Sequence, residues 1–156
     1  ESKLVAVRYP RGAQRAIPES IKPTFADFDV FGDENAEKAI ITYGRTFSAC
    51  AFAYEKLVNS GESVKLIKLN RIIPVCEGAV EAAKNCKDVY FFEEGIRRGG
   101  AGEGFLFDLS KAGFSGKYHL RAIENGFVKQ ASVESLLHKY GFDEEGVLSF
   151  VTSAED

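Results

Sequence analysis

Apolar runs typical of strands alternate with helical patterns along most of the chain, and this alternation constrains the fold more than any other feature. Strand-like runs lie at residues 39–43, 63–69, 88–94 and 117–123. The first helical pattern, residues 45–61, carries apolar residues that include Phe47, Leu57 and Val58 on one face and ends at a glycine. Strands that alternate with helices of about ten residues form βαβ units in a mainly parallel sheet covered on both faces. The sequence therefore predicts a three-layer αβα fold of the α/β class.

One further strand is expected to run the other way. Residues 25–31 contain three phenylalanines and precede turn chemistry at residues 32–35. We interpret them as a short antiparallel strand, which gives a sheet of about five strands. Further helices are predicted at residues 75–86, 104–113, 133–141 and 144–154, with Ser132 and Asp143 as N-caps of the last two.

Size, charge and cysteine content exclude several classes of protein. The chain has 156 residues, enough for one domain with a real core. A net charge of −3 argues against a nucleic-acid binder of the basic type. No apolar run is long enough to span a bilayer, and the start has no signal-like pattern. Cys50, Cys76 and Cys86 form no CxxC pair, so we expect buried free thiols and a cytoplasmic location.

The start of the chain predicts a piece of a longer protein. The chain contains no methionine and begins with Glu1. Residues 4–8 have the pattern of a strand, which three prolines follow at Pro10, Pro18 and Pro23. Proline lacks a backbone donor and restricts its neighbour, so we expect a linker there.

The stretch 93–104, EEGIRRGGAGEG, is the most site-like part of the sequence. It follows a predicted strand and opens a predicted helix, where backbone N–H groups can bind a phosphate. Its spacing matches neither GxGxxG nor GxxxxGK[ST], and Glu103 would compete with an incoming anion. The alternative is structural, since glycines also allow tight turns and close helix–strand packing. The candidate anion-binding or interface residues are Arg97, Arg98, Gly99, Gly100 and Gly102.

Ligands of such sheets bind beyond the carboxyl ends of the strands. This rule selects residues 44–46 and 70–74 in addition to the glycine-rich loop. Arg71 either binds an anion or, as we favour, forms a salt bridge with Glu93 or Glu94. The two glutamates suit acid–base chemistry if buried, although strand-end carboxylates more often cap loops or pair with cations.

The two histidines carry no recognisable chemistry. His119 and His138 have no Cys, Asp or Glu partner at metal-binding spacing, and the sequence has no GxSxG, P-loop or HExxH motif. We expect both to be structural or solvent-facing. The residues alone thus indicate a scaffold or interface domain with weak signs of anion binding.

Four segments, residues 6–12, 39–75, 89–104 and 126–147, together resemble the C-terminal part of the 1-deoxy-D-xylulose-5-phosphate synthase family. That family belongs to the transketolase group of thiamine-diphosphate enzymes. The YG loop, the R-x-x-P strand end and the EE…GG-x-G loop are shared with transketolases and with β subunits of 2-oxoacid dehydrogenases. The RYPRG start and the final SVESLLHKYGFDEEGV distinguish this family from those relatives.

The resemblance implies a reaction, cofactors and partners. The full-length enzyme would condense pyruvate with glyceraldehyde 3-phosphate to 1-deoxy-D-xylulose 5-phosphate, using thiamine diphosphate and Mg²⁺ and working as a homodimer. Residues 1–12 would be a remnant of the pyrimidine-binding domain, residues 13–24 a linker and residues 25–156 the transketolase-type C-terminal domain. The catalytic domains would precede this segment, so we expect the chain alone to bind no cofactor, nucleic acid or membrane and to be inactive.

The resemblance implies one substrate-binding residue. The arginine of Tyr-Pro-Arg-Gly, which is Arg11 here, would bind the phosphate of the aldehyde acceptor. A guanidinium fork matches phosphate oxygens, and the rigid Pro10 would fix its approach. Alternatively, Arg8 or Arg11 pairs with carboxylates of the missing domain.

Departures from the family pattern leave rival interpretations open. Ala131 stands where the family usually has Gly, and Asn125-Gly126 replaces the usual Pro-Asp. The chain is then an orthodox synthase or a divergent paralogue. One rival is a transketolase-like or 2-oxoacid dehydrogenase β-type subunit from a split gene. Another is a free-standing anion-binding regulatory module that uses residues 93–104.

Overall fold

A computed structural model describes residues 4–10, 15–124 and 126–153, and the account below concerns these residues. The elements in chain order are β1 (Phe28–Phe31), β2 (Lys38–Thr42), α1 (Thr46–Asn59), β3 (Val64–Leu69), α2 (Glu77–Ala83), β4 (Asp88–Ile96), α3 (Ala101–Lys111), β5 (Lys117–Ile123), α4 (Val133–Tyr140) and α5 (Glu144–Ser153).

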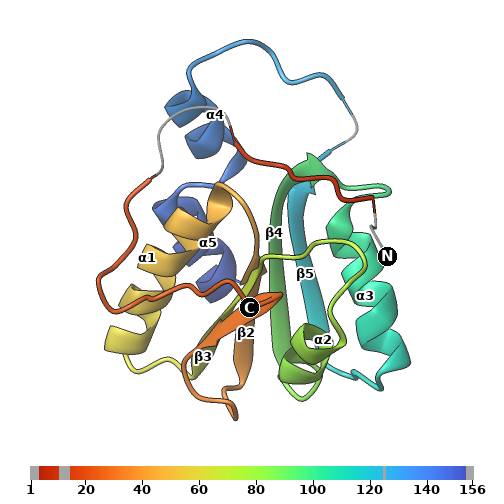
Figure 1. Cartoon of the computed structure of the whole chain (residues 1–156). Coiled ribbons are helices and arrows are strands. Elements are labelled where there is room, and N and C mark those ends of the chain that lie inside the picture. Colours follow the sequence, from red (N-terminus) through yellow and green to blue (C-terminus); the bar gives the residue numbers. More distant parts are fainter. Residues whose placement is uncertain (1–3, 11–14, 125, 154–156) are drawn as a thin grey trace.

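The strands form one sheet in the order β1-β3-β2-β4-β5 (Figure 1). β2 pairs in parallel with both β3 and β4, and β4 pairs in parallel with β5. β1 alone runs antiparallel, with Phe28 opposite Leu69. The prediction of a mainly parallel five-stranded sheet with one antiparallel strand is confirmed.

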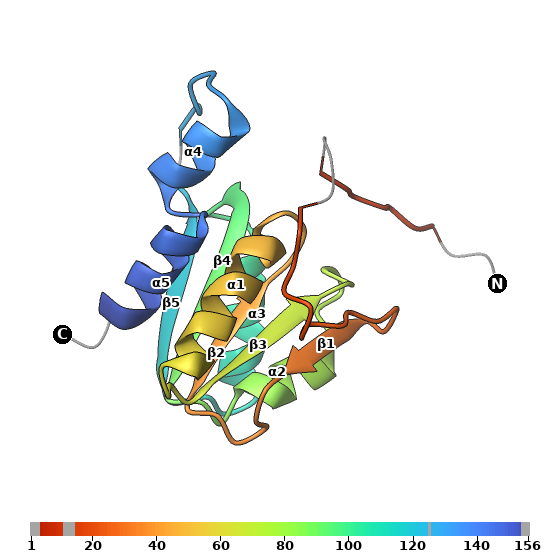
Figure 2. The same cartoon turned by 90° about the vertical axis from the view of Figure 1, so that its left-hand side faces the viewer.

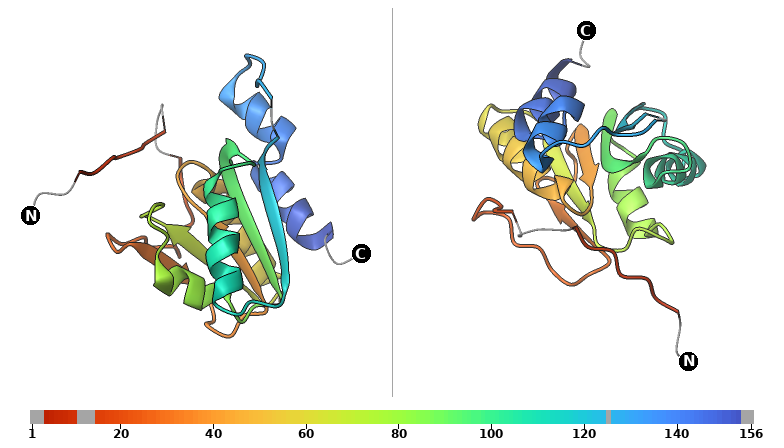
Figure 3. Two further views of the ribbon diagram at one scale, coloured as in Figure 1. Left: turned by 90° about the vertical axis from the view of Figure 1, so that its right-hand side faces the viewer. Right: turned by 90° about the horizontal axis from the view of Figure 1, so that it is seen from above.

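Helices cover both faces of the sheet, as the alternation predicts (Figures 2 and 3). α1 and α5 pack on one face over a core that includes Ile40 and Tyr90. α2 and α3 pack on the other face over Ile41 and Phe91. Neighbouring residues of a strand point to opposite faces, so the consecutive apolar residues within the central strands β2 and β4 supply both cores.

The basic residues of β3 are less exposed than their alternation with apolar residues suggests. Lys65 is only 2% exposed. Its Nζ donates to the carbonyl oxygens of Glu34 at 2.6 Å and Ala82 at 2.7 Å. A buried ammonium must find acceptors, and one loop carbonyl and one carbonyl near the end of α2 supply them here.

The predicted first helix is confirmed, with one error in its buried face. Phe47, Cys50 and Leu57 are buried, whereas Val58 is 43% exposed. Val58 follows Leu57 by 100° around the helix, so it lies at the margin of the apolar stripe and misses the sheet and α5. All three cysteines are free and buried as predicted, and burial raises the pKa of the Cys50 thiol to about 12.

Residues 4–8 do not form the predicted strand. Residues 4–10 carry no strand pairing and are exposed. A strand needs a neighbour to satisfy its ladder hydrogen bonds, and no described segment of this chain provides one. The described part of the expected linker, by contrast, lies on the domain: Ile21 is buried, and Ser48 Oγ donates to the Ala16 carbonyl at 2.5 Å. The predicted domain limits at residues 12 and 24 stay predictions.

The limits of α2 and α3 differ from the predicted limits. α2 is shorter than the predicted 75–86, and α3 begins at Ala101 rather than at residue 104. Gly102 is therefore helical and not part of the loop. The N-caps are confirmed, since Ser132 Oγ accepts from Ser135 N at 3.2 Å and Asp143 Oδ1 accepts from Gly146 N at 2.9 Å.

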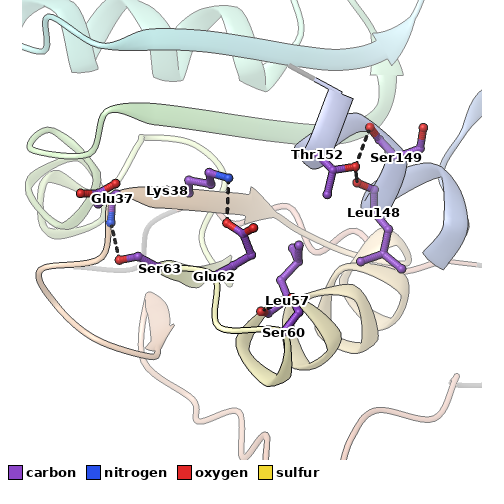
Figure 4. Close-up of polar contacts among 9 residues, drawn as sticks. All are labelled: Glu37, Lys38, Leu57, Ser60, Glu62, Ser63, Leu148, Ser149 and Thr152. Carbon is purple, nitrogen blue, oxygen red and sulfur yellow. Dashed lines mark hydrogen bonds and ion pairs between the residues drawn. The ribbon is translucent and has the colours of Figure 1, made fainter. Parts of the chain in front are cut away.

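The amino edge of the sheet is closed by local polar contacts (Figure 4). Lys38 Nζ donates to Glu62 Oε2 at 2.9 Å, and the Glu37 amide donates to Ser63 Oγ at 3.1 Å. On the neighbouring α5, the Thr152 hydroxyl donates to a carbonyl of its own helix at 3.0 Å. In the described part of the chain, no helix has the length and apolar character needed to cross a membrane.

Candidate functional site at the carboxyl edge

A cleft of about 430 Å³ lies at the carboxyl edge of the sheet. It is lined by residues 43–45 after β2, residues 68–70 with Ile72 at the end of β3, and residues 94–95 of β4. The end of the segment 8–10 closes one side. The three loops that the strand-end rule selects therefore meet in one place, as expected for a parallel sheet.

Glu93 is a buried carboxylate beneath this cleft. Its side chain lies on β4, and the residue is 1% exposed. One oxygen, Oε2, accepts from the Tyr43 hydroxyl at 2.9 Å and from the Ala101 amide at 3.0 Å. The other, Oε1, accepts from the Gly102 amide at 3.0 Å. Burial and the Glu93 charge raise the pKa of Tyr43, so its hydroxyl stays a donor.

This carboxylate joins three elements. Tyr43 directly follows β2, Glu93 belongs to β4, and the two amides open α3. A carboxylate at a helix N-terminus satisfies amides that lack an intrahelical partner and complements the helix dipole. Glu93 thus acts as a distant cap for α3, which explains why the helix begins as early as Ala101.

The Gly99 amide of the glycine-rich loop and the first amides of α3 donate to the protein's own carboxylates. Gly102 N donates to Glu93, and Gly99 N donates to Glu103 Oε2 at 2.8 Å. A Cβ on Gly100 would collide with Glu93 Oε1, so this glycine allows the close approach of β4 and α3. Binding of an external anion here stays a prediction, and such an anion would have to displace Glu93 or Glu103.

The two arginines of this loop differ in their surroundings. Arg97 Nε donates to Glu124 Oε1 at 2.7 Å, and its Nη2 donates to the Leu120 carbonyl at 2.8 Å. Arg97 therefore ties the loop to the end of β5. Arg98 is exposed.

The predicted salt bridge of Arg71 with Glu93 or Glu94 is wrong, because Arg71 pairs with Asp27 instead. Its Nη2 lies 3.1 Å from Asp27 Oδ2. The Asp27 carbonyl also accepts from the Asn70 and Arg71 amides at 2.9 and 2.8 Å, because the antiparallel β1 begins beside the end of β3. Glu94 instead faces Arg45, with 4.0 Å between Arg45 Nε and Glu94 Oε1.

A second polar network lies at the base of the cleft. Asp29 is 7% exposed and accepts from Asn70 Nδ2 at 2.9 Å and from Thr24 Oγ1 at 2.6 Å. Burial opposes its charge, but these hydrogen bonds outweigh burial and lower the pKa of Asp29. Lys68 Nζ donates to Asn70 Oδ1 and lies 5.3 Å from the centre of the Phe47 ring. Burial lowers the pKa of Lys68.

Sequence reasoning found some of these groups and missed others. Arg11 lies outside the described residues, although Arg8 and Pro10 before it line the cleft. Tyr43 and Lys68 were not predicted as site residues. The position of each at the end of a parallel strand was the available signal.

Both histidines have carboxylate partners that sequence spacing did not indicate. His119 Nε2 lies 2.8 Å from Asp88 Oδ1, and its ring stacks on Tyr90 with 4.5 Å between ring centres. His138 Nδ1 lies 2.7 Å from Asp143 Oδ2, and this hydrogen bond raises the pKa of His138. Among the described residues no group of three or more His, Cys, Asp or Glu side chains is placed to hold a metal ion.

Comparison with known proteins identifies the domain. A profile of the family described as "Transketolase, C-terminal domain" matches residues 32–147. The chain belongs to this family. The match runs from the turn after β1 into α5, so it includes every strand end that lines the cleft.

Curated relatives of this transketolase C-terminal domain carry one name. The 1-deoxy-D-xylulose-5-phosphate synthase of Shouchella clausii is 25% identical over 152 residues, which are 96% of this chain and 24% of that protein. The enzyme of the same name from Geobacillus thermodenitrificans is 29% identical over 146 residues, 88% of this chain and 22% of that protein. The enzyme of the same name from Bacteroides fragilis is 28% identical over 153 residues, which are 94% of this chain and 23% of that protein. The chain spans about a quarter of the length of these relatives, and the predicted resemblance is confirmed.

A solved structure supports the fold. The structure described as "Split gene transketolase, inactive beta4 tetramer" superimposes with a TM-score of 0.71 at 21% sequence identity. The similarity covers 88% of this transketolase C-terminal domain and 45% of that chain. The predicted architecture is therefore shared with a transketolase.

Proposed function

We propose that this domain is the C-terminal part of a thiamine-diphosphate-dependent synthase that condenses pyruvate with glyceraldehyde 3-phosphate. The product would be 1-deoxy-D-xylulose 5-phosphate, with release of carbon dioxide. The observation that carries the proposal is the set of relatives with this one name, whose similarity to the chain extends over 88 to 96% of its residues. The similarity thus includes both the domain core and most of the chain outside it.

The residues that the structure describes do not fit the metal. Mg²⁺ prefers several oxygen ligands around one point, and the described residues offer no cluster of three carboxylate or imidazole side chains. The one carboxylate among the residues that line the cleft, Glu94, faces Arg45, and the buried Glu93 and Asp29 beside it accept hydrogen bonds from internal donors. We propose that thiamine diphosphate and Mg²⁺ bind in preceding domains of a homodimeric enzyme, and that the chain alone is inactive.

The role proposed for this domain is architectural. Glu93 fixes the end of β2 against the start of α3, and Asp29 fixes the start of β1 against the end of β3. Both networks make the carboxyl edge rigid. A rigid edge is suited to hold neighbouring domains in a constant position, which supports catalysis by keeping reacting groups aligned.

The test is product analysis with the full-length protein from the parent gene and with the 156-residue chain. With pyruvate, glyceraldehyde 3-phosphate, thiamine diphosphate and Mg²⁺, we expect 1-deoxy-D-xylulose 5-phosphate from the full-length protein and none from the chain. A full-length protein that exchanges two-carbon units between sugar phosphates but leaves pyruvate unused would establish the transketolase-like alternative. Product formation by the chain alone would contradict the architectural role.

A further inference from the structure

An apolar groove lies beside the cleft, beneath α4. Its volume is about 160 Å³. We call it the α4 groove, and its apolar lining comes from the end of β5, the segment before α4 and α4 itself: Ile123, Val128, Val133, Leu136 and Tyr140. Soluble proteins seldom leave a contiguous apolar hollow open to water unless something covers it.

The segment before α4 adds exposed apolar side chains next to this groove, among them Phe127, the neighbour in sequence of the lining residue Val128. Phe127 is fully exposed, and Val128 and Val133 are 41% and 39% exposed. In Figure 1 this segment stands clear of the sheet at the same end of the molecule as α4. A large exposed aromatic ring beside an apolar hollow is the combination that forms the core of protein interfaces.

The α4 groove and the cleft form one surface. Arg45 and Glu94, which face each other at 4.0 Å, line both hollows. The surface thus has an apolar half under α4 and a polar half over the ends of β2 and β3. An apolar centre next to charged groups is typical of a surface that binds one specific protein partner.

The segment 4–10 extends the same edge. Arg8 and Pro10 line the cleft, and the exposed side chains before them include Leu4, Val5 and Val7. In Figures 1 and 2 this segment and α4 both lie at the end of the molecule where the parallel strands finish. A partner connected through this segment would therefore join the domain at the same end as the α4 groove.

We propose that the α4 groove, together with the exposed Phe127 next to its lining residue Val128, is the docking surface for the preceding catalytic part of the same polypeptide. This inference rests on the proposed function. The occupant follows from the length comparison, because the chain covers only 22 to 24% of the three relatives. The docking segment should present apolar side chains to Val133 and Leu136 and polar groups to the Arg45–Glu94 pair.

The test uses introduced cysteines as probes of burial. The native cysteines of this chain are buried, so a new surface thiol reacts selectively. We would make Phe127→Cys, and Val58→Cys as the control, in both the 156-residue chain and the full-length protein. Val58 is an exposed apolar residue near the end of α1, at the opposite edge of the sheet. Maleimide labelling of each site is measured by mass spectrometry of its peptide.

We expect the thiol at position 127 to be labelled at least about tenfold more slowly in the full-length protein, since interface cores exclude water. The thiol at position 58 should react equally in both proteins. Equal labelling at position 127 in the two proteins would overturn the inference. The inference would also be overturned if position 127 of the 156-residue chain were labelled more slowly at higher protein concentration, because a second copy of the chain would then occupy the groove.

The same full-length sample separates this inference from the proposed function. Protection at position 127 without synthase activity would support the docking surface and overturn the reaction. Synthase activity together with unprotected labelling at position 127 would support the reaction and overturn the docking surface. Circular dichroism of both variants checks that the introduced cysteines leave the fold unchanged.

Discussion

At the scale of single residues, two adjacent glutamates have opposite roles. Glu93 is buried and accepts three hydrogen bonds, whereas the Glu94 side chain is 42% exposed and faces Arg45 at 4.0 Å. Nothing in the sequence separates the two. The difference arises because successive residues of a strand point to opposite faces, and only one face meets the start of α3.

We predict that Glu93→Gln destabilises the chain by about 2 kcal/mol, whereas Glu94→Gln costs less than about 0.5 kcal/mol. An amide at position 93 has only one acceptor oxygen, so it leaves a buried donor without a partner. Urea unfolding of both variants measures the difference. Equal unfolding midpoints for the two variants would show that Glu93 does not hold α3.

The pair His138–Asp143 should make stability depend on pH. Hydrogen bonding to Asp143 raises the pKa of His138 above its ordinary 6.5, so its contribution is complete below pH 6.5 and is lost as pH rises through the folded-state pKa. Burial opposes the charge of Asp143, but bonds from His138 and Gly146 lower its pKa below 3.8. Its contribution is therefore present above pH 3.8 and is lost as pH falls through the lowered value.

We accordingly predict that His138→Gln lowers the free energy of unfolding most between about pH 4 and 6.5, and least once the pH has risen above the raised folded-state pKa of His138. Unfolding curves of both proteins at several pH values give this profile. A loss of stability that is constant from pH 4 to 9 would mean that the ion pair has no part in it.

Arg11 gives a prediction that belongs to the full-length enzyme. If its guanidinium binds the acceptor phosphate, Arg11→Ala should raise the KM for glyceraldehyde 3-phosphate by about tenfold or more, because a charge-assisted hydrogen bond is lost. The KM for pyruvate should stay nearly constant. Steady-state kinetics with each substrate varied in turn provides the measurement, and an unchanged aldehyde KM would assign Arg11 to pairing with protein carboxylates.

At the scale of elements, α4 is held in place by its last turn. It ends at Gly141, whose φ of 70° is left-handed, and a Cβ there would collide with the Arg121 guanidinium. That guanidinium also lies 4.2 Å from the centre of the Phe150 ring. The turn between α4 and α5 therefore depends on glycine for both its conformation and its space.

Both Gly141→Ala and Gly44→Ala place alanine in the left-handed conformation, so both should destabilise the chain. Gly141→Ala also forces the collision with Arg121, and we expect it to cost about 1 kcal/mol or more in addition. Gly44 is the matched control, since its φ is 63° and a Cβ there would meet nothing within 4 Å. Thermal unfolding of both variants gives the comparison. Equal losses would imply that Arg121 moves aside without cost.

At the scale of the whole molecule, the order of strands and helices was predictable because each element has a clear period. Ser132 and Asp143 marked their helix starts equally well. The site was less predictable, since Tyr43, Glu93 and Gly102 meet only through the parallel pairing of β2 with β4. The absent strand at residues 4–8 has a related cause, because a strand pattern cannot form a ladder without a neighbour.

The reaction proposed for the full-length protein can be followed by the carbon dioxide that it releases. Pyruvate labelled at its carboxyl carbon is supplied with thiamine diphosphate and Mg²⁺, with and without glyceraldehyde 3-phosphate. We expect sustained release of labelled carbon dioxide only when the aldehyde is present, at one molecule per molecule of aldehyde consumed. Sustained release that does not depend on the aldehyde, or no release at all, would contradict the proposed reaction.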